Sequence, residues 1–78
     1  MSPEARRVLV AVVDFEAQAC GGVIPLKRIA MDTLSDAEAA SRALRELDLA
    51  ACVRTDTMGW QEGWVTRRGR ALAQRLAA

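Results

Sequence analysis

Apolar side chains recur with helical spacing over residues 3–20, and they cover more than one side of the predicted helix. Ser2 provides an N-cap hydroxyl, Pro3 suits the first helical position, and Gly21 with Gly22 forms a stop signal. The β-branched run inside this segment would also suit a strand, but about 18 residues separate the start and stop signals, which favours a helix. We expect a core-facing side and, beside it, a second apolar strip: the first comprises Ala5, Val8, Leu9, Val12, Phe15 and Ala19, the second Val10, Val13 and Ala17.

The middle of the chain predicts two further helices. Pro25 begins a short helix over residues 26–31, which a tight connection joins to the next. Ser35 and Glu38 fit the S-x-x-E capping box, which predicts a helix over residues 35–48. The spacing predicts that the apolar side chains of these helices face the core: Leu26, Ile29, Ala30, Ala37, Ala40, Leu44 and Leu47. The predicted outer face of the second helix carries Glu38, Ala39, Arg42, Arg45 and Glu46.

The last third predicts an antiparallel hairpin followed by a final helix. Residues 52–56 and 64–66 have the composition of strands, and a glycine-containing loop joins them. A short extended piece at 23–24 precedes Pro25. The final helix covers residues 67–77, with Leu72 and Leu76 on its apolar side. The chain is therefore expected to form a single domain over residues 1–78, of α+β class and mostly helical.

The two tryptophans and the two cysteines have individual expectations. Strand alternation places Trp64 in the core. Trp60 lies in the predicted loop, where it either folds back onto the sheet or stands exposed as an anchor for a partner. Cys20 and Cys52 have apolar neighbours and no CxxC spacing, and we interpret both as small buried hydrophobes.

Composition argues against several function classes. The chain has 78 residues, 51% of them hydrophobic, which suffices for one small core. It contains no histidine and no phosphate-loop, nucleophile-elbow or dinucleotide-binding motif, so we expect no enzyme, no metal and no cofactor. The longest apolar run is far shorter than a membrane span and the start does not resemble a signal peptide, which makes a cytoplasmic protein without membrane contact the expectation.

The order of predicted elements resembles the winged helix-turn-helix fold of MarR- and PadR-type bacterial transcriptional regulators. Residues 41–47 (SRALREL) look like the end of their recognition helix, and residues 64–72 (WVTRRGRAL) are similar to their second wing strand and final-helix entry, L-T-x-x-G-x-x-L. The chain departs from this pattern at Ala50 and Ala51, where such regulators usually have glycine. The resemblance implies a three-helix core, a two-stranded wing with an additional short strand, and a C-terminal helix.

The resemblance also implies a small regulator that binds double-stranded DNA. Its recognition helix corresponds to residues 35–48 and its wing to residues 52–66. Arginine can pair bidentately with guanine in the major groove, and neighbouring basic side chains can contact phosphate. The implied DNA-binding residues are Arg42 and Arg45 as base readers, Ser41 for close approach, Lys27 and Arg28 toward phosphate, Arg54 and Trp60 on the wing, and Arg68 in a basic phosphate patch.

Charge distribution keeps a second function open. Residues 35–48 carry four acidic and two basic side chains, a net charge of −2, while the four arginines of residues 67–77 give +4 and the whole chain only +1. This is not the basic footprint typical of a DNA-binding domain. The alternative is a winged-helix adaptor or inhibitor, of the kind found in phages and mobile elements, which binds another protein through residues 35–48 and Trp60.

The second apolar strip of residues 3–20 predicts a homodimer. Val10, Val13 and Ala17 need a cover, and in so short a chain we expect it to come from another subunit, with help from the last helix. A dimer would also let a protein with few cationic contacts bind a two-fold DNA site.

Overall fold

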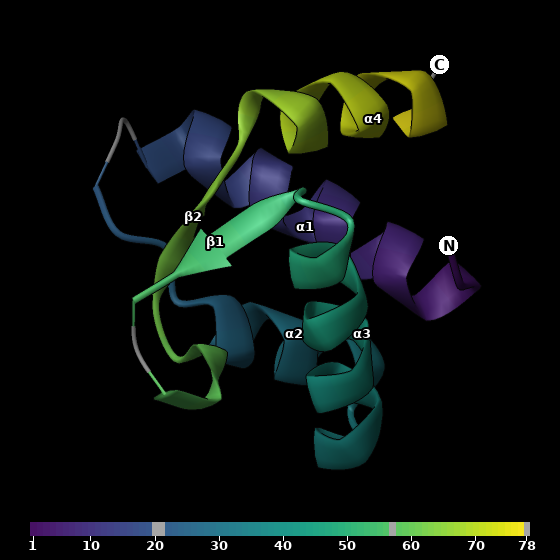
Figure 1. The fold of residues 1–78 in the computed structure, drawn as a ribbon, viewed down its shortest axis with the longest axis vertical. Coiled ribbons are helices and arrows are strands. Elements are labelled where there is room, and N and C mark those ends of the chain that lie inside the picture. Colours follow the sequence, from purple (N-terminus) through teal and green to yellow (C-terminus); the bar gives the residue numbers. More distant parts are fainter. Residues whose placement is uncertain (20–21, 57, 78) are drawn as a thin grey trace.

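The computed structural model describes residues 1–19, 22–56 and 58–77. This part of the chain forms four α-helices and one two-stranded antiparallel sheet (Figure 1), which confirms the α+β, mostly helical class. The elements are α1 (Pro3–Ala19), α2 (Leu26–Leu34), α3 (Ala37–Leu49), β1 (Val53–Thr55), the 3-10 turn η1 (Met58–Trp60), β2 (Gly63–Val65) and α4 (Arg67–Ala77). Cys20 and Gly21, to which we assigned a buried position and a helix stop, lie outside the described residues.

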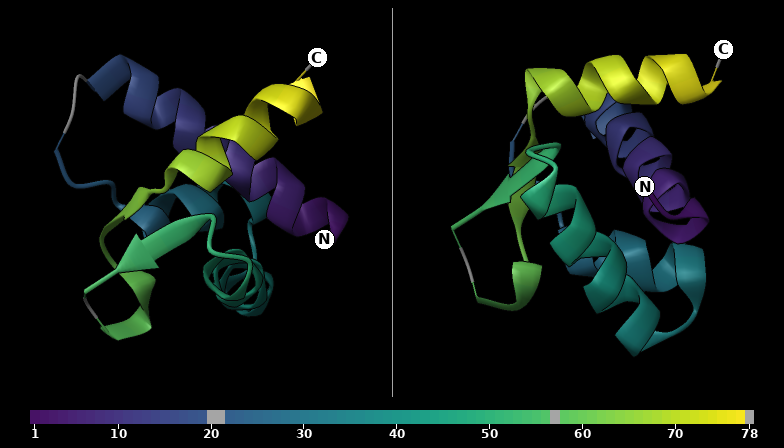
Figure 2. Two further views of the ribbon diagram at one scale, coloured as in Figure 1. Left: turned by 45° about the horizontal axis from the view of Figure 1, so that its top comes forward. Right: turned by 45° about the vertical axis from the view of Figure 1, so that its right-hand side comes forward.

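Helix α1 is the central element of the fold. It packs against α2 and α3 on one side and against α4 on another, and Figure 2 shows α4 crossing α1 on the side away from α2 and α3. The second apolar strip of α1 is therefore covered in part within the same chain: Val13 packs against the core and is half-buried, as is Val10, while Ala17 stays exposed. None of the helices in the described residues is both long and apolar enough to cross a membrane.

The core matches most of the predicted inward positions. Leu44 and Leu47 of α3 are fully buried in one cluster with Val12 of α1. Two expectations on α3 are wrong: Ala37 is exposed because it begins the helix beyond the edge of the core, and Ala39 is buried instead of facing outward. On α1, Phe15 and Ala19 were also expected to face the core, and this is wrong. Phe15 is 37% exposed and Ala19 is exposed, because the far end of α1 extends past its neighbours.

The connection between α2 and α3 differs from the predicted capping box. Helix α2 continues to Leu34, so the expected tight connection is its last turn. Ser35 ends it in a left-handed conformation (φ 57) and donates its N–H to the carbonyl of Met31. Because Ser35 is used in this way, Asp36 becomes the N-cap of α3 and accepts from the backbone N–H of Glu38.

The sheet register determines the direction of the Trp64 side chain. Val53 pairs with Val65 and Arg54 with Trp64, and the two valines face the core. Trp64 therefore points outward and is 47% exposed, so its predicted core position is wrong. A Cβ at Gly63 would lie 2.1 Å from the Arg54 carbonyl oxygen, which makes glycine necessary where the strands come together.

The turns at the ends of the hairpin use unusual backbone conformations. Ala51 adopts φ 61, taking the left-handed position for which the resembled regulators use glycine. The turn closes with the N–H of Cys52 donating to the carbonyl of Leu47 at 2.9 Å. The predicted short extended piece is present as a single antiparallel bridge between Ile24 and Gly63.

Helix α4 is attached to the hairpin through Thr66 and Gly69. The Thr66 hydroxyl oxygen accepts the Gly69 N–H at 3.0 Å, which makes Thr66 the N-cap of α4. The same hydroxyl lies 2.6 Å from the carbonyl oxygen of Ala51. A Cβ at Gly69 would be 2.2 Å from the Cys52 carbonyl oxygen, so the first turn of α4 can approach the chain before β1 only because residue 69 is glycine.

We expect Leu44→Ala to lower the free energy of unfolding by about 2–5 kcal/mol, because the leucine side chain is fully buried at the centre of the core. Leu49→Ala is the matched control on the same helix, since Leu49 is 83% exposed and its loss should cost less than about 0.5 kcal/mol. Urea denaturation followed by circular dichroism measures both. Equal destabilisation by the two variants would contradict the packing of α3.

Gly69→Ala should destabilise the protein by about 1–3 kcal/mol, because the added methyl group meets the Cys52 carbonyl. Helix propensity alone predicts the opposite sign, a gain of about 1 kcal/mol. Gln74→Ala, at an exposed position of the same helix, should stay within about 0.5 kcal/mol of the parent. A more stable Gly69→Ala protein in thermal or urea unfolding would show that α4 does not approach Cys52 this closely.

Candidate functional site

The exposed face of α3 carries the two candidate base-reading arginines. Arg42 and Arg45 are both exposed and lie three residues apart, so their side chains leave the same side of the helix. The Arg42 guanidinium is 3.9 Å from the Glu38 carboxylate, and the two side chains are 66% and 89% exposed. A shallow hollow of about 370 Å³ lies at this point, lined by Ala37, Glu38, Ser41 and Arg42.

Lys27 and Ser41 are engaged with each other. The Lys27 ammonium group donates a hydrogen bond to the Ser41 hydroxyl, which joins the first turn of α2 to the middle of α3. Both residues are half-buried, whereas Arg28, the next residue on α2, is exposed. Of the two α2 cations, Arg28 is the one whose side chain makes no hydrogen bond or ion pair within the described residues.

Trp60 folds back onto the body of the protein. Its ring packs against the core and is half-buried, so the expectation of an exposed anchor is wrong. Trp60 folds back as the other expectation had it, but its turn η1 contacts α2 and α3 and not mainly the sheet. The Arg45 guanidinium carbon lies 6.0 Å from the centre of the Trp60 ring, at the limit of a cation–π contact. Trp60 adopts φ 55, and its indole nitrogen is buried without a hydrogen-bond partner in the described residues. The hairpin loop is thus strained into contact with α3.

Met58 is the residue exposed at the tip of this loop in place of Trp60. Its side chain is 94% exposed. Sequence reasoning missed this position because it assigned the partner-facing role to the larger aromatic. The signal available was Gly59, which adopts φ 73 and reverses the chain between the two residues.

Arg54 holds the hairpin against the end of α3. Its guanidinium donates to the Asp48 carboxylate at 3.2 Å and to the Asp48 carbonyl oxygen at 3.1 Å. A cation at the last turn of a helix is also favoured by the partial negative charge of the free carbonyls there. Arg54 therefore has a positioning role.

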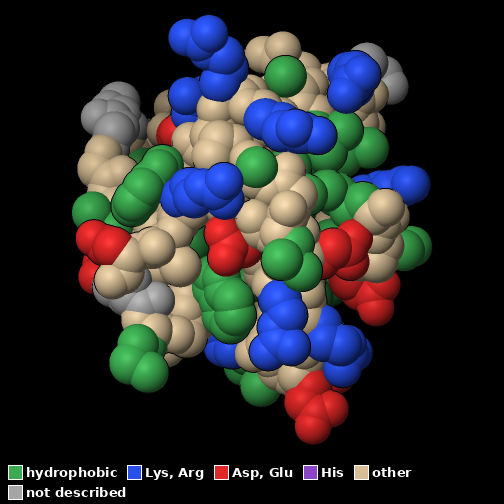
Figure 3. All heavy atoms as spheres, viewed as in Figure 1, with side chains coloured by type: hydrophobic (Ala, Val, Ile, Leu, Met, Phe, Trp, Pro, Cys, Tyr) green, Lys and Arg blue, Asp and Glu red, His purple; other side chains and the backbone are tan. Residues whose placement is uncertain are grey.

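The basic side chains of α4 lie apart from the start of α3. Arg68 is exposed in the first turn of α4, and Arg70 pairs with Glu16 of α1 at 2.9 Å. In Figure 1 α4 crosses the top of the molecule, whereas α3 begins at the bottom. Figure 3 shows the corresponding charge pattern, with Lys and Arg side chains gathered at the top and both signs mixed at the lower right. The predicted Arg68 patch and the α3 arginines thus form separate surfaces.

The Cys52 thiol is a buried titratable group. Burial raises the pKa of the Cys52 thiol, and the positive charge of Arg68 opposes this only in part. Cys52 is 1% exposed, which confirms its interpretation as a small buried hydrophobe. Within the described residues no group of three or more Cys, Asp and Glu side chains could hold a metal ion.

Glu46 connects α3 to the start of the chain. Its carboxylate accepts a hydrogen bond from the backbone N–H of Ser2 at 2.7 Å and lies 3.9 Å from the terminal amino group of Met1. The hydrogen bond from Ser2 lowers the pKa of the Glu46 carboxyl below its ordinary value of 4.5. Glu46, assigned to the outer face of the helix, is therefore half-buried and positions α1 against α3.

Comparison with protein-family models, with curated proteins and with solved structures finds no match to this chain. Its function must therefore be inferred from its own residues.

The lowered pKa of Glu46 predicts a pH-dependent contribution to stability. Because the folded-state pKa lies below 4.5, the contribution is fully present above pH 4.5 and is lost as the pH falls through the folded-state value. We expect Glu46→Gln to lower the free energy of unfolding at pH 7 by less than about 1 kcal/mol, since the side chain is partly exposed, and to differ less from the parent at pH 3.

Thermal unfolding at the two pH values measures this effect. Asp56→Asn is the control, because Asp56 is an exposed carboxylate away from the Ser2–Glu46 contact. A Glu46→Gln deficit that stays constant or grows between pH 7 and pH 3 would contradict the role of the Ser2 hydrogen bond.

Proposed function

We propose that the chain is a winged helix-turn-helix protein that binds double-stranded DNA and regulates transcription, with α3 as the recognition helix and the β1–β2 hairpin as the wing. The element order supports this: α2 and α3 follow one another and pack together, and an antiparallel hairpin and a final helix come next. In proteins of this type the second helix of the pair enters the major groove. A regulator of this kind works in the cytoplasm.

The observation that carries the proposal is the position of Arg42 and Arg45. Both guanidinium groups stand on the exposed side of α3, which is free of contact with α1 and α2. An arginine fork can donate two hydrogen bonds to guanine, and each such pair is worth about 1–3 kcal/mol of discrimination between bases. Two arginines one turn apart can therefore read neighbouring base pairs.

The contacts of these arginines are compatible with DNA binding. The Glu38–Arg42 pair is highly exposed, and exposed pairs contribute about 0–1 kcal/mol, so Arg42 can exchange Glu38 for a base at small cost. The Arg45 guanidinium lies 6.0 Å from the centre of the Trp60 ring, at the limit of a cation–π contact, so Arg45 can also turn to a base at small cost.

The other candidate residues divide into contact and positioning roles. Arg28 is exposed and can meet a phosphate. Lys27, Ser41 and Arg54 hold α2 and the hairpin in place around α3, through the Lys27–Ser41 hydrogen bond and the Arg54–Asp48 ion pair. Arg68 lies on α4 and is outside the proposed interface. With so few free cations on this face, binding should depend more on base contacts than on phosphate attraction.

The second candidate function is capture of another protein by the same surface. The mixed signs of Glu38 and Arg42 favour it, because paired opposite charges on one exposed surface suit a protein partner. Met58, 94% exposed on the hairpin loop, offers an apolar side chain for such a partner. In this version Met58 replaces Trp60 as the anchor of a phage-type adaptor or inhibitor.

Arg42→Ala tests the DNA-binding proposal. A duplex selected from a random pool by the parent protein serves as the specific site, and fluorescence anisotropy measures affinity for it and for random duplex. We expect about 5- to 150-fold weaker binding to the selected duplex, corresponding to about 1–3 kcal/mol, and a much smaller loss on random duplex. Arg68→Ala is the charge-matched control, and it should change the affinity for the selected duplex by less than about threefold because α4 lies away from α3.

Equal losses for Arg42→Ala and Arg68→Ala would overturn α3 as the reading helix. Failure of the parent protein to bind any duplex at low salt would overturn the proposal altogether. The adaptor function then gains support if Met58→Asp abolishes binding to a purified protein partner while Met31→Asp, at a surface position of α2, leaves it unchanged.

A further inference from the structure

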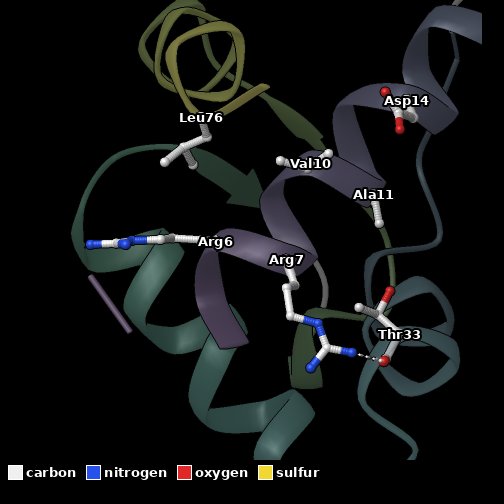
Figure 4. A pocket seen from close by; sticks show the side chains of 7 residues that line it. All are labelled: Arg6, Arg7, Val10, Ala11, Asp14, Thr33 and Leu76. Carbon is white, nitrogen blue, oxygen red and sulfur yellow. Dashed lines mark hydrogen bonds between the residues drawn. The ribbon is translucent and has the colours of Figure 1, made fainter. Parts of the chain in front are cut away.

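A shallow groove of about 540 Å³ lies along α1, on the side that α2, α3 and α4 leave open. Arg6, Arg7, Val10, Ala11 and Asp14 line it from α1, Thr33 from the last turn of α2 and Leu76 from the last turn of α4. Figure 4 shows α1 passing between Leu76 on one side and Thr33 on the other, with Val10 directed toward Leu76 and Arg7 toward Thr33. The DNA-binding proposal does not involve this surface.

Four of these residues form one stripe along α1. Arg7, Val10, Ala11 and Asp14 are spaced i, i+3, i+4 and i+7, so they follow the same side of the helix for two turns. Val10 and Ala11 are half-buried in the centre, and the charged residues at the two ends are exposed. The stripe thus has a cation at one end, an anion at the other and an apolar middle.

The two charged ends are held differently. The Arg7 guanidinium donates one hydrogen bond to the Thr33 carbonyl oxygen at 3.0 Å, which fixes its direction and leaves its other donors unused within the described residues. Asp14 takes part in no ion pair with the described residues. Because a guanidinium has five N–H donors, Arg7 can also donate two hydrogen bonds to the carboxylate of a partner in bidentate geometry.

We propose that this groove binds a second copy of the same chain, with the two α1 helices antiparallel about a two-fold axis that passes between Val10 and Ala11. Antiparallel pairing about that point brings Arg7 of each copy opposite Asp14 of the other. It also places each Val10 against Ala11 of the other copy. The stripe is therefore complementary to itself, which is what a two-fold interface requires of a single surface.

The central residues suit a close helix–helix contact. Ala11 is small enough to receive the larger Val10 of the other copy, and packed helices lie about 8–10 Å apart when the side chains between them are of this size. Leu76 beside Val10 extends the apolar area onto α4. A standard interface buries about 800 Å² per partner, roughly a sixth of the 4865 Å² surface, so the contact must include this last turn of α4 as well as α1.

The choice of a second copy follows from charge. A partner with one sign of charge would leave either Arg7 or Asp14 facing a like or absent charge, at a cost in binding free energy. A second copy in antiparallel orientation satisfies both ends at once, in two equivalent ion pairs. The inference goes beyond the proposed function and does not depend on it, since it concerns a different side of the molecule.

Charge reversal at the two ends of the stripe tests the pairing. Sedimentation equilibrium of the full chain measures the dimer dissociation constant. Protein concentrations of about 5–500 µM cover dissociation constants of about 10⁻⁶–10⁻⁴ M. We expect the parent to dimerise, and Arg7→Asp or Asp14→Arg alone to weaken dimerisation at least about tenfold, because each places like charges opposite one another. The double variant Arg7→Asp with Asp14→Arg should return to within about threefold of the parent.

The rescue distinguishes the proposal from an unspecific apolar contact. Arg67→Asp and Asp56→Arg are the matched controls: they reverse exposed charges elsewhere and should leave the dissociation constant unchanged. Circular dichroism verifies folding, and Asp14→Arg keeps the test decisive if loss of the Arg7–Thr33 hydrogen bond destabilises the other variants. A parent that is monomeric at 500 µM (about fivefold above a dissociation constant of about 10⁻⁴ M), or an Asp14→Arg protein that dimerises as well as the parent, overturns the proposal.

Discussion

Burial of α1 between two other parts of the chain is the constraint on which the rest of the structure depends. Val8, Leu9 and Val12 are fully buried in the core shared with α2 and α3. A helix that is apolar on more than one side needs more than one cover, since each exposed methylene group costs about 0.8 kcal/mol relative to its burial. Helix α4 supplies the second cover, and Leu72 packs against the core from it. The groove lined by Arg7, Val10, Ala11 and Asp14 is a part of α1 that these covers leave open.

Placing α4 over α1 requires the hairpin to bring the chain back across the molecule. Two close backbone approaches make this possible, at Gly63 against the Arg54 carbonyl and at Gly69 against the Cys52 carbonyl. In both places a side chain would force the backbones apart. The hairpin is therefore part of the core structure, and the Arg54–Asp48 ion pair ties it to α3 as well.

Charged residues in this small domain have separate tasks. Glu46, Arg54 and Arg70 join elements that are distant along the chain, through contacts to Ser2, Asp48 and Glu16. Arg42 and Arg45 remain on the open side of α3, with weak contacts that a ligand can replace. The low net charge of the chain thus conceals two different surfaces, a mixed one over α3 and a basic one over α4 (Figure 3).

Local pattern by itself determined the existence and order of the helices, the antiparallel hairpin and the burial of Leu44 and Leu47, because helical and strand periodicity depend on neighbouring residues alone. Only the tertiary structure decided which tryptophan is exposed. A one-residue change of register exchanges the two faces of a strand, and the register here follows from Gly63 at the core. The tertiary structure likewise decided that Lys27 forms a hydrogen bond with Ser41. The two residues lie on different helices, and the distance between helices depends on packing and cannot be derived from the spacing of residues in the sequence.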